Sequence, residues 1–191
     1  MNSGTKLLER AVSYATRSVL DVTPADLQCP TPCHGWNLDM LLRHASESLA
    51  ALHDATATGH VALIPDGQCG LFDPVQAFRN QAGRLLAARA VSCPRQELDV
   101  GGLPLPGITA ECAGAIEIVV HGWDISQACG QCRPIPESLA ASLLVIVPLL
   151  IPETSRHSLF SPPVQTGPQA SLGDQLVAFL GRKPVPRPGT A

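Results

Sequence analysis

Glu117 and His121 are the residues of this sequence whose types and spacing best fit a chemical role. They lie in the segment AIEIVVHGWDISQA, residues 115–128, which is otherwise mostly apolar. A spacing of four residues places both side chains on one face of a helix. A carboxylate buried without a partner is costly, and a divalent cation held by both side chains would offset that cost. The pattern predicts two ligands of a metal site; the alternative is an exposed ion pair.

Two ligands are too few, because a catalytic metal generally has three protein ligands and one open position. The best third candidate is His44, in LLRHASESL, at the edge of the apolar face of another predicted helix. Asp124 is either a partner that holds His121 by its other ring nitrogen or a polar residue near the helix end. Two histidines and a glutamate suit zinc, and Fe, Ni, Mn or Cu fit the same ligand types. The other histidines are expected at the surface, namely His34, His53, His60 and His157.

Helical spacing of apolar residues predicts the elements that position these side chains. The expected helices cover residues 4–20, 37–57, 73–91, 108–128, 136–151 and 172–182. A Pro-rich connector occupies 23–36, and 93–107 is predicted to be a loop or an irregular strand. No strand pattern is strong enough to build a sheet. The sequence predicts an all-α fold: a four-helix bundle with an additional apolar helix and a short C-terminal helix. One domain over 1–191 is expected, with 161–191 a partly extended tail.

Composition narrows the function. The chain has 191 residues, 45% apolar and 15% charged, as is typical of globular proteins. A net charge of -3 without a Lys/Arg cluster argues against nucleic-acid binding. The most apolar stretch, residues 138–151, is too short to cross a bilayer, and no signal peptide is evident, so we expect a cytoplasmic protein. The apolar helix at 136–151 leaves a homodimer open.

Seven cysteines in a reducing compartment are expected to be mostly free thiols. An alternative is a zinc site with four sulfur ligands, because the sequence holds a CxxxC pair and a CxxC pair. These pairs are Cys29 with Cys33 and Cys129 with Cys132.

Three motifs resemble one family. TPCHGWNLDMLLRHASESL and EIVVHGWDISQA resemble two motifs of the DinB and mycothiol-dependent maleylpyruvate isomerase N-terminal superfamily. LGDQLVAFLGRKP is similar to the ending of a short actinobacterial branch of metal-binding proteins. The resemblance implies a DinB-like bundle whose metal ligands match His44, Glu117 and His121. It implies a packing role for Trp36 and a structural one for Cys33.

The resemblance further implies a metal-dependent enzyme of the thiol-transferase or isomerase type, with mycothiol as co-substrate and a small-molecule substrate. A coordinated thiol is deprotonated at neutral pH and can attack an electrophile. Maleylpyruvate isomerisation itself is not expected, because the separate C-terminal domain of the isomerase has no counterpart here. Two alternatives stay open: a thiol-independent hydrolase, lyase or cyclase of a biosynthetic pathway, and a non-catalytic metal-binding protein.

Other parts of the site are expected from position alone. His34 stands where the branch has proline, so it is a candidate for the entrance of the site. The stretch QCGLFDP, residues 68–74, is expected to be a variable active-site loop. Arg79 or Arg84 is a candidate clamp for a substrate carboxylate, and no catalytic base can be assigned.

Overall fold

The computed structural model describes residues 3–61, 73–152, 156 and 160–184. The chain divides into two compact units, Met1–Arg133 and Pro134–Ala191, each described by itself below. The predicted all-α fold is confirmed, whereas a single domain over the whole chain stays a prediction. None of the described helices combines the length and the apolarity that crossing a membrane requires.

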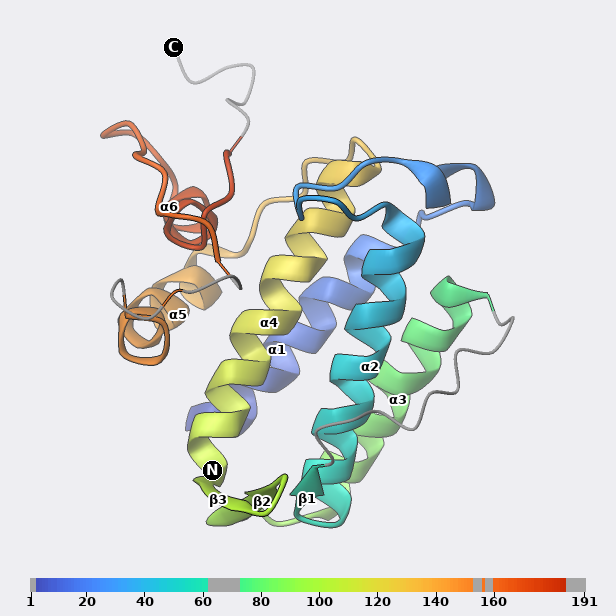
Figure 1. Cartoon of the computed structure of the whole chain (residues 1–191), viewed down its shortest axis with the longest axis vertical. Coiled ribbons are helices and arrows are strands. Elements are labelled where there is room, and N and C mark those ends of the chain that lie inside the picture. The colour runs from blue at the N-terminus through green and yellow to red at the C-terminus, as the bar shows by residue number, and fades with distance from the viewer. Residues whose placement is uncertain (1–2, 62–72, 153–155, 157–159, 185–191) are drawn as a thin grey trace. The chain divides into compact units, whose positions relative to one another are not determined.

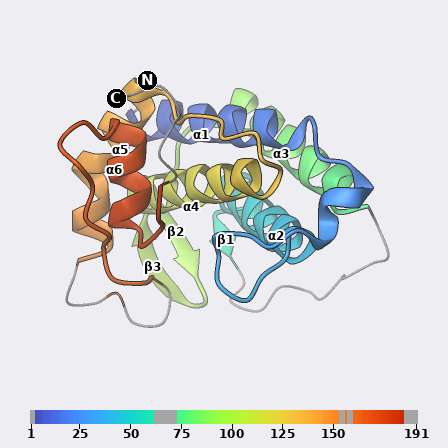
Figure 2. The same cartoon turned by 90° about the horizontal axis from the view of Figure 1, so that it is seen from above.

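Four long helices form a bundle in the first unit. Its helix α1 packs most extensively against α4, and α2 packs against both α3 and α4 (Figure 1). Seen from above, α4 lies between α1 and α2 (Figure 2). The bounds of these helices are α1 Ser3–Val19, α2 Leu38–Ala57, α3 Pro74–Val91 and α4 Gly107–Ala128.

The helix starts follow from local chemistry. The Asn37 side chain accepts a hydrogen bond from the Met40 backbone N–H at 3.0 Å, which satisfies one of the free donors at the start of α2. Asp73 does the same for Val75 at the start of α3, where Pro74 fits the first helical position. The predicted starts at these two residues therefore coincide with their caps.

Helix α4 is buried on most of its circumference. Its large apolar residues are at most 4% exposed, namely Ile116, Ile118, Val119, Val120, Trp123 and Ile125. Gly122 allows α1 to approach closely, because a Cβ there would lie 2.8 Å from the Ala15 Cα. Polar residues on this helix are thus held in a rigid and largely apolar setting.

A small sheet closes one end of the bundle, and the expectation of no sheet was wrong. Its strands lie in the order β1 (His60–Val61), β2 (Glu97–Val100) and β3 (Leu103–Pro106). Strands β2 and β3 are antiparallel and joined by Gly101 and Gly102, both with positive φ. Two such residues suit the tight turn of a hairpin. Alternation is weak because only Leu98 of β2 is fully buried, which is why the apolar pattern did not predict the strands.

The connector between α1 and α2 is compact. A 3₁₀ helix, η1 (Pro24–Gln28), begins it, and a β-bridge then pairs Pro30 with Asn37. The Thr31 hydroxyl and backbone N–H both donate to the Trp36 carbonyl, at 2.9 and 3.2 Å. These bonds fix the loop that carries the Trp36 ring.

The second unit contains α5 (Glu137–Leu150) and α6 (Leu172–Phe179), which pack against each other. The Ser171 hydroxyl accepts the Asp174 backbone N–H at 3.1 Å and so caps α6. At the other end of α6, the buried Arg156 guanidinium donates to the Phe179 carbonyl and lies over that ring. A cation suits this position, because the last carbonyls of a helix are negative.

Candidate metal centre

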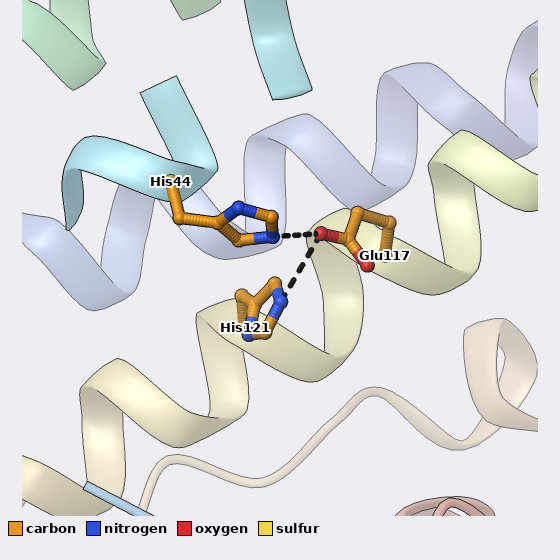
Figure 3. A group of neighbouring side chains, drawn as sticks. All are labelled: His44, Glu117 and His121. Carbon is orange, nitrogen blue, oxygen red and sulfur yellow. Dashed lines mark hydrogen bonds and ion pairs between the residues drawn. The ribbon is translucent and has the colours of Figure 1, made fainter. Parts of the chain in front are cut away.

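His44, Glu117 and His121 converge at one point between α2 and α4 (Figure 3). The Nε2 atom of His44 lies 2.8 Å from Glu117 Oε1, and Nε2 of His121 lies 3.1 Å from the same oxygen. The three candidate ligand atoms all lie within 4.8 Å of one another. We call these three residues the HEH cluster. It brings together two imidazoles and a carboxylate from positions 73 residues apart in the chain.

The geometry follows from the two helices. Glu117 and His121 are one turn apart on α4, and His44 faces them from α2. Gly114, three residues before Glu117 on α4, contacts the Leu52 side chain of α2. A Cβ on Gly114 would lie 2.4 Å from a methyl carbon of Leu52 on α2.

Asp124 lies behind the cluster and has no exposed surface. Its Oδ2 atom is 3.1 Å from Nδ1 of His121. His121 is therefore held between two carboxylates, one on each ring nitrogen. A carboxylate on the remote nitrogen of a histidine is the usual arrangement behind a metal ligand, since it fixes the ring and the tautomer.

Electrostatic coupling sets the charges of the cluster. Burial alone lowers the pKa of His121, but hydrogen bonds to Asp124 and Glu117, and their charges, outweigh it and raise that pKa to about 9. Burial alone raises the pKa of Glu117, but hydrogen bonds with His121 and His44 hold it well below its usual range. Without a metal, His121 is an imidazolium between the Glu117 and Asp124 carboxylates at neutral pH.

Exposure of the cluster is uneven. The His121 side chain is 7% exposed, whereas His44 and Glu117 are 38% and 30% exposed. The His121 side of the cluster is therefore buried, whereas His44 and Glu117 are partly exposed to solvent.

Two further residues contact the cluster, and neither was predicted as part of the site. The Trp36 ring lies edge-on to His44, with ring centres 4.8 Å apart, and stacks on His121 at 6.4 Å. The Ser48 hydroxyl donates to Glu117 Oε1 at 3.2 Å. Trp36 was predicted to pack the connector on the bundle, and the GW motif gave no sign that its ring reaches the histidines.

Of the other residues proposed for the site, the structure describes His34, Arg79 and Arg84, and their roles stay predictions. His34 is exposed in the connector. Arg79 donates to the Val19 and Leu20 carbonyls at the end of α1, and Arg84 bonds Gln81 at the surface. Most of the predicted loop at 68–74, residues 68–72, lies outside the described residues.

The cysteines do not form the alternative zinc site. The six described cysteines are free thiols. Within the described part of the chain, no set of three cysteine sulfurs lies close enough together to hold a metal. Burial raises the pKa of Cys129 to about 11, helped by the charges of Asp26, Cys29 and Asp21, so this thiol is protonated at neutral pH.

Comparison with protein families gives a match over much of the chain. A family model described as the mycothiol maleylpyruvate isomerase N-terminal domain matches residues 8–126. This range runs from within α1 to within α4 and includes Asp124 and all three HEH residues. Comparisons with curated proteins and with solved structures give no match. The model covers well over half of the chain, and the chain therefore belongs to the mycothiol maleylpyruvate isomerase N-terminal domain family of the DinB-like superfamily.

Proposed function

We propose that the HEH cluster binds a divalent cation through His44 Nε2, Glu117 and His121 Nε2. The convergence of three donor atoms within 4.8 Å carries this proposal. The proposal extends to function: the protein is a metal-dependent enzyme of the thiol-transferase or isomerase type.

The chemistry of the donors fits a transition-metal ion. Imidazole nitrogen and carboxylate oxygen bind zinc at about 2.0–2.1 Å, which puts tetrahedral ligand atoms about 3.3 Å from one another. The two nitrogen–oxygen distances of 2.8 and 3.1 Å are close to that spacing. Asp124 supplies the outer carboxylate that such sites use. Zinc is the proposed metal, with Fe, Ni, Mn or Cu as alternatives of similar ligand preference.

Three protein ligands and an exposed side support an enzyme over a storage or structural site. Structural zinc sites are closed by four protein ligands, whereas catalytic sites keep one position open. His44 and Glu117 form the solvent-facing side of the cluster, so a fourth ligand from solution can reach it. Trp36 bounds the approach with an apolar ring surface.

The family supports a thiol as that fourth ligand, since its description names mycothiol. A bound divalent cation would keep a coordinated thiol in its thiolate form at neutral pH. The residues of this chain position the reaction. Asp124 holds a proton on His121 Nδ1, which leaves Nε2 as the nitrogen that faces the cation site. Such a thiol would add to an electrophilic small molecule, and a proton from solvent would complete the conjugate; renewed loss of the thiol would give isomerisation.

Metal analysis of purified protein tests the cation site. His44→Ala, Glu117→Ala and His121→Ala are each expected to lose most of the bound metal. His53→Ala is the matched control, because His53 also lies on α2 but bonds Asp54 rather than the cluster. Unchanged metal content in all three cluster variants would overturn the proposal.

A titration of the Co(II)-loaded protein with mycothiol, or with N-acetylcysteine as a mimic, tests the thiol. Direct coordination is expected to add a sulfur-to-cobalt charge-transfer band and to shift the visible bands. A silent spectrum in a protein that binds Co(II) through the HEH cluster would exclude the thiol reading. It would favour the thiol-independent hydrolase, lyase or cyclase, or a non-catalytic metal-binding protein.

A further inference from the structure

Ser48 is a second polar residue of α2, besides His44, that hydrogen-bonds Glu117. The two lie four residues apart on α2, so both side chains face α4 from successive turns. The Ser48 hydroxyl and His44 Nε2 meet the same carboxylate oxygen, Oε1, at 3.2 and 2.8 Å. Two side chains of α2 therefore hold the same oxygen of Glu117.

The direction of this hydroxyl is informative because serines in helices commonly bond the carbonyl four residues earlier. Ser46, two positions away on α2, does so: its hydroxyl donates to the Leu42 carbonyl at 2.7 Å. The Ser48 hydroxyl instead crosses to α4. On the same helix, therefore, Ser46 bonds the helix backbone and Ser48 bonds the cluster.

Glu117 is the cluster member that most needs such a hold. Its side chain has three rotatable bonds and is 30% exposed, whereas His121 is fixed by Asp124 and by burial. Fixing a long glutamate side chain in one orientation costs conformational entropy. A donor anchored on the opposite helix restricts the carboxylate to the orientation in which it faces both imidazoles.

We propose that Ser48 is a positioning residue that orients the Glu117 carboxylate for the cation. It acts through Glu117 and does not itself contact the metal. This inference rests on the proposed cation site, and it assigns a role to a residue outside the ligand set. Removing the hydroxyl keeps all three ligand residues but lets the Glu117 carboxylate rotate away from the cation. The affinity for the cation therefore falls, although the site is not lost.

Metal affinity in a set of matched variants tests the proposal. Ser48→Thr and Ser48→Val have side chains of the same shape and differ only in the hydroxyl, and Ser46→Ala is the control on the same helix. Zn(II) affinity is measured by chelator competition, and the Co(II) visible spectrum reports the ligand environment. Ser48→Val and Ser48→Ala are expected to bind about tenfold more weakly, at the lower end of the losses seen when an outer-shell partner is removed.

Ser48→Thr is expected to stay within about threefold of the parent protein, and Ser46→Ala to match it, with Co(II) spectra unchanged in both. Thermal unfolding of the metal-free variants identifies any that fail to fold, and the Thr and Val pair remains informative if Ser48→Ala is one of them. Equal affinities for Thr and Val would overturn the role of Ser48 while leaving the cation site intact. A parent protein that binds no cation would overturn both.

Discussion

Binding of a cation by the HEH cluster should release about one proton at pH 7, and that proton should come from His121. In the metal-free protein the Asp124 and Glu117 carboxylates face the two ring nitrogens, and the pKa of His121 is raised to about 9. A group with that pKa is about 99% protonated at pH 7. A histidine must be neutral at the ligating nitrogen, so the cation has to displace the proton on Nε2.

The release should fall as the pH rises, from about one proton at pH 7 to about half at pH 9. Below pH 9 the apparent affinity should increase about tenfold per pH unit, because free protein then needs less deprotonation. Calorimetric titration with Zn(II) in buffers of different ionisation enthalpy measures the release directly. When the observed binding enthalpy is plotted against the ionisation enthalpy of the buffer, the magnitude of the slope is the number of protons released.

Asp124→Asn is the diagnostic variant. It removes one of the charges that raise the pKa of His121, so its proton release at pH 8 should be smaller than that of the parent protein. A release that grows between pH 7 and 9 would instead indicate ionisation of a bound water. That result, or less than about half a proton at pH 7, would refute the assignment of the charge to His121.

Three further predictions concern stability, measured by chemical denaturation of the metal-free protein. Gly122→Ala should lower the free energy of unfolding by about 1–3 kcal/mol, since its Cβ would lie 2.8 Å from the Ala15 Cα; full stability would contradict this close packing. Glu111→Ala should lower the free energy of unfolding by about 3 kcal/mol, because the substitution leaves the buried Arg89 side chain, 5% exposed, without its closest carboxylate at 3.0 Å. A smaller loss than for a surface glutamate would argue against a buried ion pair. Protonated His121 should add up to about 3 kcal/mol to the free energy of unfolding below pH 6.5, the pKa of an unfolded histidine. This contribution should be lost as the pH rises through 9, the raised pKa in the folded protein. Constant stability from pH 6.5 to 9 would contradict the raised pKa.

The bundle and the HEH cluster could be predicted because their signals are local. Apolar periodicity and the caps at Asn37 and Asp73 define the helices, and the E-x-x-x-H spacing places two polar groups on one face of a buried helix. His44 required the additional assumption that its helix faces the helix of Glu117 and His121 in the bundle, and the family resemblance then pointed to the same residue. Within the bundle, few polar side chains of α2 are placed to face the Glu117–His121 pair of α4.

Trp36 and Ser48 were missed because their roles depend on contacts distant in sequence. The position of the Trp36 ring is set by the folded connector, through the Pro30–Asn37 bridge and the bonds of Thr31. A serine on a half-buried helix face usually bonds its own backbone, and only the close approach of α2 and α4 shows that Ser48 does otherwise. The hairpin had a signal that was overlooked: the Gly101–Gly102 pair between two short runs containing leucine.

The position of the ligands in the chain bears on how the bundle would assemble around a cation. Glu117 and His121 are presented by a single turn of α4, so even a partly folded α4 offers two donors, whereas His44 arrives from 73 residues away. A cation held first by the local pair would favour helical structure there and would then close a long loop when α2 docks, reducing the conformations open to the rest of the chain. Because the local pair also binds some metal before docking, the gain in equilibrium stability is smaller than the affinity of the finished site. The metal would then influence the folding route as well as the final stability of the protein.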